Sequence, residues 1–224
     1  MNRTLVTALV TGSAIVGAGY FLSRRQPPRA LPSSIIPIIT PVIDVGVAED
    51  VLEAMEHLPG DEVTLVLHTM GGCVTSCVLI ANALRQFGKS TAVVPYMAIS
   101  GGTLIALNAH HLQMGRSASL SAVDPILYGQ RARHVPGDES MKALHGLALE
   151  YQQAMTRYLR ETLAARLPDA GEAALEQAMG VFMGDHAPHE WPIRRPEVEA
   201  LGLDVTPAAR SWGAMVDTFR KRWW

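Results

Sequence analysis

Apolar residues in the first half of the chain form short continuous runs that alternate with helical repeats. Residues 35–39, 63–68 and 91–96 are β-branched or apolar runs of the length expected for strands buried on both faces. Residues 48–58 and 73–87 repeat their apolar positions with the period of a helix. This alternation predicts parallel β-α-β units, in which ligand sites lie beyond the carboxyl ends of the strands.

The second half of the chain is predicted to be mainly helical. Its longest predicted element is an amphipathic helix over residues 139–166, which Asp138 can cap. An irregular stretch is expected before it, up to residue 137. The shorter predicted elements are β segments at 112–114 and 119–123 and helices at 170–179, 196–201 and 207–219.

The N-terminus carries a candidate membrane segment. Residues 4–22 are uncharged for 19 positions, which is long enough to cross a bilayer. The alternative is a cleaved signal peptide, but the run is long for one and no clean A-x-A-like site follows it. Three arginines follow the segment and one precedes it, so the positive-inside rule places the following domain in the cytoplasm. We expect a single-pass signal anchor at 1–25, a proline-containing linker at 26–34, a folded domain at 35–206, and a C-terminal helix with a basic-aromatic tail at 207–224.

The amino-acid composition and net charge limit the classes of function that this chain could have. The chain has 224 residues, 48% of them hydrophobic, and a net charge of -2, so it can build a sizeable core and lacks a nucleic-acid-binding surface. Cys73 and Cys77 are four apart on one predicted helix, a poor spacing for a disulfide, and are interpreted as reduced core residues. No metal-ligand spacing is present, and neither metal nor cofactor is expected.

Two glycine turns follow neighbouring predicted strands. Gly71-Gly72 comes after the strand at 63–68, and Ser100-Gly101-Gly102 comes after the strand at 91–96. The start of a helix favours negative charge, so a serine there is suited to act as a nucleophile. The alternative is that Ser100 only caps its helix. Because both turns end strands of one parallel sheet, we expect them to form one site.

The motifs around these turns resemble those of the Clp-protease/crotonase superfamily. Residues 67–72 (LHTMGG) resemble its oxyanion turn, and residues 98–107 (AISGGTLIAL) resemble its nucleophile turn. With residues 121–125 (SAVDP) and 189–193 (HEWPI), the pattern resembles the serine dehydrogenase proteinase family, relatives of signal peptide peptidase A and the stomatin-operon membrane proteases. The resemblance spans roughly residues 35–205. It implies an α/β fold of stacked ββα units with a mostly parallel sheet.

The resemblance also implies roles for single residues. Ser100 would attack a peptide carbonyl, and backbone N–H groups of Gly101 and of Gly71 or Gly72 would form the oxyanion hole. Met70 departs from the family pattern, which usually has proline before the glycine pair. Residues 123–125 lack the histidine that a Clp-type triad has at this point.

Three residues are candidates for assisting Ser100. Related membrane proteases use a Ser–Lys dyad with the lysine about forty residues further on, and Lys142 lies 42 residues beyond Ser100. Lys142 would need burial to act as a base, and the alternative is a solvated surface lysine. Asp124 could orient a base or anchor its loop, and His189 is either a structural anchor or a third group of the site.

The function expected from these features is a membrane-anchored, ATP-independent serine peptidase that cleaves proteins or peptides. A homo-oligomer is expected, and a stomatin-like partner is an option. One alternative is a catalytically inactive scaffold of the same fold, since no base is evident beside the serine. A crotonase-like enzyme acting on acyl-CoA is the other, since an oxyanion hole suits that chemistry too.

Overall fold

The computed structural model describes residues 34–220 of the chain. The membrane anchor expected at 1–25, nearly all of the linker, and the last four residues of the basic-aromatic tail lie outside the described residues. Within residues 34–220, none of the helices has the length and apolar character needed to span a bilayer.

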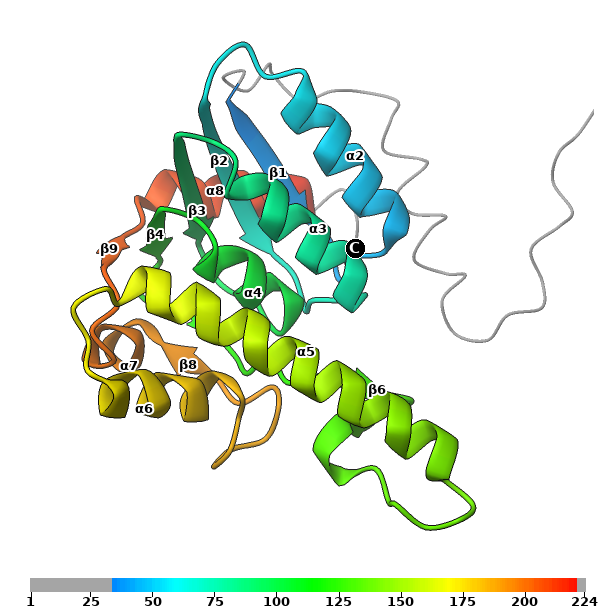
Figure 1. Ribbon diagram of the computed structural model, residues 1–224. Coiled ribbons are helices and arrows are strands. Elements are labelled where there is room, and N and C mark those ends of the chain that lie inside the picture. Colours follow the sequence, from blue (N-terminus) through cyan, green and yellow to red (C-terminus); the bar gives the residue numbers. More distant parts are fainter. Residues whose placement is uncertain (1–33, 221–224) are drawn as a thin grey trace, which may run out of the picture.

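A five-stranded parallel sheet forms the centre of the molecule (Figure 1). In spatial order its strands are β1 (Ile35–Ile39), β2 (Glu62–His68), β3 (Lys89–Val94), β4 (His111–Met114) and β9 (Val205–Pro207). All four neighbouring pairs are parallel, which confirms the predicted β-α-β organisation. Strand β9, which was not predicted, lies across the expected domain boundary at residue 206 and pairs with β4.

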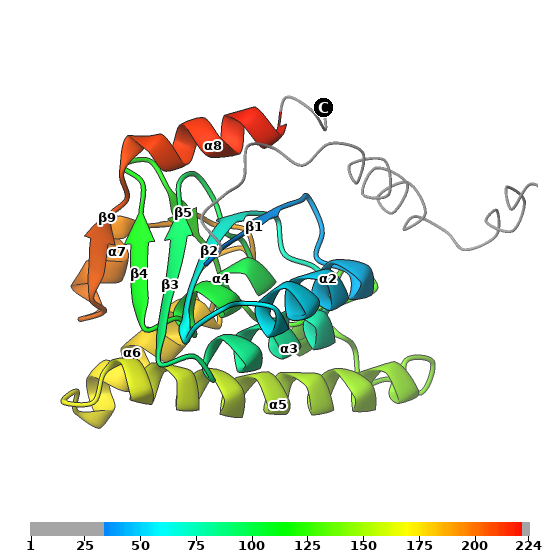
Figure 2. The ribbon, with the colours of Figure 1, turned by 90° about the horizontal axis from the view of Figure 1, so that it is seen from above.

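Helices cover both faces of the sheet, as Figure 2 shows. The helices α2 (Val45–Glu56), α3 (Val74–Leu84) and α4 (Gly101–Leu107) lie on one face, and α8 (Arg210–Arg220) lies on the other. Val216 of α8 is fully buried and belongs to one apolar cluster with strand residues Val66 and Val93. Coverage on both faces explains why these strands are continuously apolar instead of alternating.

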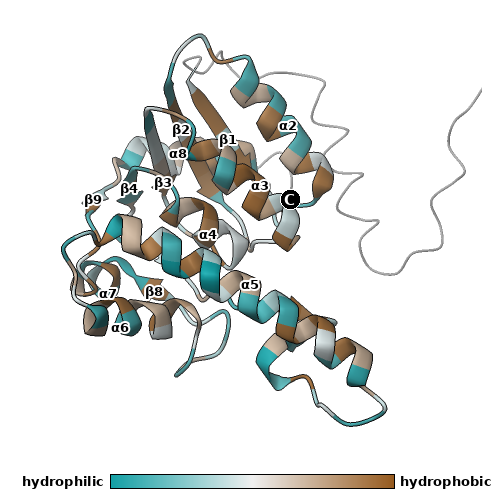
Figure 3. Cartoon of the chain, in the orientation of Figure 1, coloured by the Kyte–Doolittle hydropathy of each residue, from teal (hydrophilic) through white to brown (hydrophobic). Residues whose placement is uncertain are grey.

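The main core lies between the sheet and the helices α2, α3 and α4, and it extends to α5 (Lys142–Arg166) and α6 (Glu172–Phe182). Figure 3 shows hydrophobic residues concentrated on the central strands and on α3. The fully buried residues Leu65, Ile80, Ile105 and Phe182 all belong to this cluster. The core therefore extends under α4, the helix that begins directly after Ser100.

Helix α5 (Lys142–Arg166) runs along α4 and continues past the sheet (Figure 1). It begins three residues later than predicted, because Asp138 does not cap it. The Asp138 carboxylate instead accepts the Met141 N–H in the preceding turn, at 3.1 Å. Beside the start of α5 lie a small antiparallel hairpin and a 3₁₀ turn, namely β6 (Ile126–Leu127), β7 (Gln130–Arg131) and η1 (Ala132–His134).

A separate two-stranded sheet joins two parts of the chain that are distant in sequence. Strand β5 (Ser119–Leu120) pairs antiparallel with β8 (Ile193–Arg194). The helices α6 (Glu172–Phe182) and α7 (Arg195–Ala200) flank β8 in the chain. The pairing places residues just after β5 beside the loop that joins α6 to β8.

Candidate active site

The two glycine turns lie side by side at the carboxyl ends of β2 and β3. The Ile99 N–H donates to the Thr69 carbonyl at 3.0 Å, and Thr69 bridges to Ala98 in parallel. Gly71 has a φ of +95°, and a Cβ there would lie 2.8 Å from the Ser100 Cβ. The predicted contact between the turns is therefore present, and it leaves no room for a side chain at position 71.

Ser100 has an unusual backbone conformation. Its φ is 53° and its ψ is −118°, and Tyr128 is the only other non-glycine residue with positive φ in the described part of the chain. Ser100 occupies the position just before α4, yet its side chain makes no capping hydrogen bond. The simple capping role considered from the sequence is therefore wrong. Strained residues of this kind cluster at active sites, because the surrounding structure must hold them in place.

Ser121 holds the strained backbone of Ser100. The Ser100 N–H donates to the Ser121 Oγ at 2.8 Å, and the Ser121 Oγ donates to the Ala122 carbonyl at 3.0 Å. The Ser121 N–H in turn donates to the Oγ1 of Thr103 at 2.9 Å. Ser121 is fully buried, and no role was predicted for it from the sequence, although it lies in the SAVDP motif.

Two backbone N–H groups lie beside Ser100 and face no backbone acceptor. Gly101 is the first residue of α4, where a helical N–H has no partner within the helix. A Cβ built on Gly101 would be 3.6 Å from the Gly72 nitrogen, so the two glycines approach each other closely. The Gly71 N–H, by contrast, already donates to the Thr69 Oγ1 at 3.1 Å. The arrangement can therefore accept negative charge through Gly72 and Gly101.

A small cavity of about 60 Å³ opens beside the serine, and we call it the nucleophile cavity. Ser100, Gly72 and Gly101 contribute to its lining, as does Asp124. The rest of the lining is apolar: Val74, Cys77, Leu104, Val123, Pro125, Ile126 and Met155. The cavity thus joins the serine, the two glycine N–H groups and one buried carboxylate.

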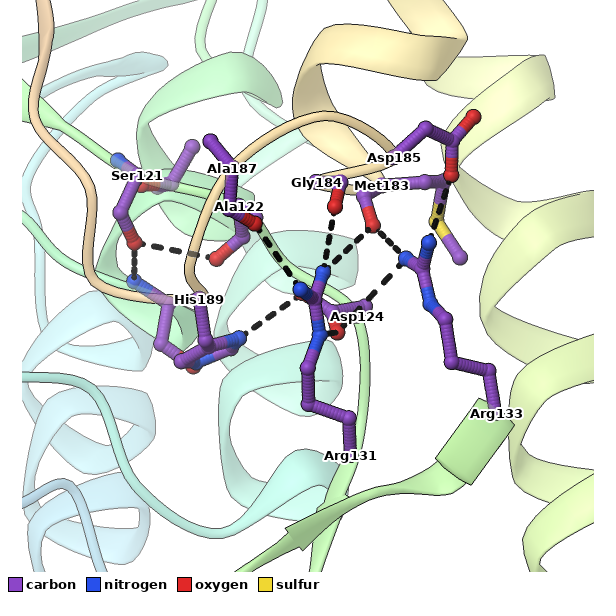
Figure 4. Close-up of polar contacts among 12 residues, drawn as sticks. Ser121, Ala122, Asp124, Arg131, Arg133, Met183, Gly184, Asp185, Ala187 and His189 are labelled. Atoms are coloured by element: carbon purple, nitrogen blue, oxygen red, sulfur yellow. Dashed lines mark hydrogen bonds and ion pairs between the residues drawn. The ribbon is translucent and has the colours of Figure 1, made fainter. Parts of the chain in front are cut away.

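Asp124 is a buried carboxylate with three partners, shown in Figure 4. Its Oδ1 lies 2.8 Å from the Nδ1 of His189, and its Oδ2 lies 2.6 Å from the Nε of Arg131. The Nη2 of Arg133 is 3.7 Å from the same Oδ2. Burial alone would raise the pKa of Asp124, but the hydrogen bonds from His189 and Arg131 hold that pKa below its ordinary value. The group is therefore a buried anion held by basic side chains at the edge of the nucleophile cavity.

Arg131 also holds the loop that carries His189. Its Nη1 donates to the Ala187 carbonyl at 2.9 Å, and its Nη2 donates to the Gly184 carbonyl at 2.6 Å and to the Met183 carbonyl at 3.3 Å. The guanidinium thus binds the carboxylate and the loop at the same time, as Figure 4 shows. The sequence contained no signal for this residue, which lies in an irregular arginine-rich stretch.

Lys142 is not among the residues that line the nucleophile cavity. Its side chain is 73% exposed at the start of α5, and its ammonium lies 3.6 Å from the carboxylate of Glu139. The spacing of 42 residues from Ser100 therefore does not bring the two side chains together within this protomer.

The two cysteines differ from the expectation that both are core residues. Both are free thiols, but Cys73 is exposed and only Cys77 is buried. Burial raises the pKa of Cys77 to about 12. Partial burial acts in the same direction on Cys73, but hydrogen bonds from Ser76 and Thr75 outweigh it and lower the pKa of that thiol. Cys77 is thus a neutral wall of the nucleophile cavity.

Comparison with known proteins gives a family and uncharacterised relatives. A family model described as ClpP-like SDH-type serine proteinase matches residues 29–210. Two uncharacterised proteins of Methanocaldococcus jannaschii are 31% and 29% identical over 177 and 176 residues. Each match covers 73% of this chain and 60% or 59% of the relative, so the chain spans about three fifths of their length.

The fold is similar to that of solved ClpP structures. ClpP1 from Listeria monocytogenes superposes with a TM-score of 0.54 at 15% identity, covering 80% of this chain and 95% of that one. A point mutant of the same protein gives a TM-score of 0.58 at 15% identity and covers 94% of its own chain. These similarities confirm the predicted Clp-type α/β fold.

Proposed function

Because the chain belongs to the ClpP-like SDH-type serine proteinase family, we propose that it is a serine peptidase with Ser100 as nucleophile. The observation that carries this proposal is the conformation of Ser100, a strained serine before a helix whose hydroxyl does not cap that helix. A strained turn of this type exposes the hydroxyl to a substrate, as in other nucleophilic serines.

The oxyanion hole is assigned to the N–H groups of Gly72 and Gly101. Both glycines border the nucleophile cavity, and neither N–H group is taken by a backbone acceptor. Of the two glycines left open from the sequence, Gly72 is preferred because the Gly71 N–H is bound to Thr69. Gly71 serves by its lack of a side chain, which lets the two turns touch. One such donor contributes about 3–4 kcal/mol to transition-state binding.

We assign the base to His189, with Asp124 as the residue that orients it. The Nδ1 of His189 is 2.8 Å from Asp124, so the hydrogen on Nδ1 is held there and Nε2 is the nitrogen left to take a proton. Asp124 lines the same cavity as Ser100, whereas His189 and Lys142 are both absent from that lining. The proposal therefore requires His189 to approach Ser100 when substrate binds, and catalytic hydrogen bonds often tighten only in the complex.

The Ser–Lys dyad expected from the sequence stays a prediction, and it requires Lys142 to come closer to a serine. Lys142 would have to leave Glu139 and the solvent, or act on another copy of the chain, to reach a serine. The contact of His189 with a buried carboxylate is the reason to prefer the histidine.

A fluorophosphonate probe tests the nucleophile. We expect it to label the wild-type chain and to leave Ser100→Ala unlabelled, with the same unfolding temperature in both samples. Labelling of Ser100→Ala would show that another residue reacts. Absence of labelling in a well-folded wild type would favour the inactive-scaffold alternative, and turnover of an acyl-CoA thioester in place of peptides would favour the crotonase-like one.

Paired histidine and lysine variants test the base. His189→Ala is expected to lower kcat by about 10²–10⁴, the usual contribution of a general base. His186→Ala, an exposed histidine in the same loop, is the matched control and should retain activity. If Lys142→Ala abolishes turnover while His189→Ala retains it, the lysine is the base and our assignment is wrong.

The cellular setting is proposed from the sequence. We expect a single-pass membrane protein with the catalytic domain in the cytoplasm, active without ATP on proteins or peptides, assembled as a homo-oligomer and open to a stomatin-like partner. Membrane fractionation of the full chain, protease protection of vesicles, and light scattering of the purified protein test the anchor, the orientation and the oligomer in turn.

A further inference from the structure

The position of the nucleophile cavity beside Ser100 determines which part of a substrate it would receive. The residue on the acyl side of the scissile bond carries the carbonyl that Ser100 attacks, so its side chain must lie next to Ser100. The cavity is bordered by Ser100 and by both N–H groups assigned to the oxyanion hole. The inference below therefore rests on the proposed peptidase function and specifies its substrates.

The volume of the cavity sets an upper limit on that side chain. The volume of the nucleophile cavity is about 60 Å³. An apolar protein cavity that binds benzene measures about 150 Å³. A phenyl ring therefore does not fit unless the walls move.

The walls are closed on the inner side by tightly packed residues. Cys77 and Leu104 are at most 1% exposed, and Met155 is 5% exposed. Cys77 itself is wedged against the nucleophile turn, because a Cβ on Gly101 would lie 2.2 Å from its Sγ. Close packing of this kind resists expansion, so the volume is a property of these side chains.

The cavity is also unsuited to a charged side chain. Its polar groups are Ser100, the glycine N–H groups assigned to the substrate carbonyl, and Asp124, and Cys77 is held as a neutral thiol. The single carboxylate, Asp124, is already bound by Arg131 and His189 and is not free to pair with a substrate lysine or arginine. Burying an unpaired charge there would be strongly unfavourable.

We propose that the nucleophile cavity receives the substrate side chain on the acyl side of the scissile bond and selects small uncharged residues of the size of alanine or serine. Met155 of α5 and Ile126 of the β6–β7 hairpin are the specificity-determining residues. They close the cavity from outside the parallel sheet, whereas Cys77 and Leu104 support the nucleophile turn itself.

A substrate series on the full chain tests the proposal. Tetrapeptides with an aminomethylcoumarin leaving group differ only in the residue before the cleaved bond: alanine, leucine, phenylalanine or lysine. We expect kcat/KM for alanine to exceed that for leucine and phenylalanine at least about tenfold, since one methylene too many changes selectivity by about 10–200-fold. A wild type that prefers phenylalanine or lysine overturns the proposal.

Variants with an enlarged nucleophile cavity show whether the cavity determines the substrate preference. Met155→Ala and Ile126→Ala should each shift the ratio toward leucine by about tenfold or more. Ile126 is 40% exposed, so its truncation remains informative if Met155→Ala fails to fold. Met179→Ala removes an equally buried methionine on α6 that does not line the cavity, and it should leave the ratio unchanged.

Labelling of the same samples distinguishes failure of the selectivity proposal from failure of the peptidase function. If Ser100 reacts with a fluorophosphonate but neither widened variant alters the preference, the selectivity proposal is wrong and the peptidase function stands. If wild-type Ser100 does not react, the function fails and the selectivity proposal fails with it.

Discussion

The Nδ1 of His189 lies 2.8 Å from a carboxylate oxygen of Asp124, although 65 residues separate them in the chain. Asp124 follows β5 and His189 precedes β8, and the antiparallel pairing of these two short strands brings the residues together. A histidine whose Nδ1 is bound to a buried carboxylate has its Nε2 left for other partners, which is the arrangement a general base requires.

Replacing Ser100 by glycine should stabilise the protein while inactivating it. The positive φ of Ser100 costs about 1–3 kcal/mol, and glycine avoids that strain at an entropic cost of about 0.4–1 kcal/mol. We expect a net gain of about 1 kcal/mol, or about 2–4 °C in Tm by calorimetry. Ser211→Gly, on the exposed face of α8, is the control and should lower Tm. A lower Tm for Ser100→Gly would mean that the serine is not strained.

Gly71→Ala should destabilise the fold and abolish labelling of Ser100. The new Cβ would lie 2.7 Å from the Ile99 carbonyl oxygen and 2.8 Å from the Ser100 Cβ, at a φ of +95°. We expect a loss of about 2–5 kcal/mol in the free energy of unfolding, measured with urea. Gly146→Ala is the matched control, since a Cβ at this helical position meets nothing within 4 Å. It should raise stability by about 0.5–1 kcal/mol and leave activity intact.

Arg131→Ala should lower both stability and kcat. It removes the guanidinium that binds Asp124 and three loop carbonyls, and breaking such a buried ion pair costs about 3–5 kcal/mol. We expect a lower kcat because His189 loses its fixed position, and denaturation plus steady-state kinetics measure both effects. Arg160→Ala removes an exposed arginine paired with Glu172 and Glu176, and it should change neither stability nor kcat appreciably. Full activity in Arg131→Ala would show that the loop holds His189 unaided.

Asp124 should make the fold sensitive to acid. Its pKa in the folded protein is below the ordinary value of 3.8, so its ionised form favours folding, and this stabilisation is present above about pH 4. The contribution is lost as the pH falls through the folded pKa, where the carboxylate takes up a proton. The stability difference between wild type and Asp124→Asn, from urea unfolding at pH 3 to 7, should therefore shrink toward acid pH. The exposed Asp169→Asn serves as control, and a constant difference for Asp124→Asn would contradict the assignment.

The central fold followed from the sequence because its elements are long or strongly apolar. The strand at 35–39 was predicted with its observed bounds, and the two glycine turns meet as expected. Strands β6, β7 and β8 have two residues each, too few for any period to be visible, and they were missed. The same limit hid β9, with three residues.

Only those residues of the site that belong to a local sequence pattern could be predicted. Ser100 and its glycines could be found because a serine between a strand and a helix has a recognisable local pattern. The role of Arg131 depends on contacts with residues more than fifty positions away, and no local pattern encodes these. The spacing along the chain predicted Lys142 as a base, but this lysine lies exposed at the start of α5 and outside the lining of the nucleophile cavity.

Helix α5 connects the exposed end of the molecule to the wall of the nucleophile cavity as one rigid rod. Its 25 residues span about 37 Å, and Met155 lies about 20 Å along the axis from Lys142. A change in the tilt of α5 therefore moves Met155 together with the exposed end of the helix, because both belong to one continuous element.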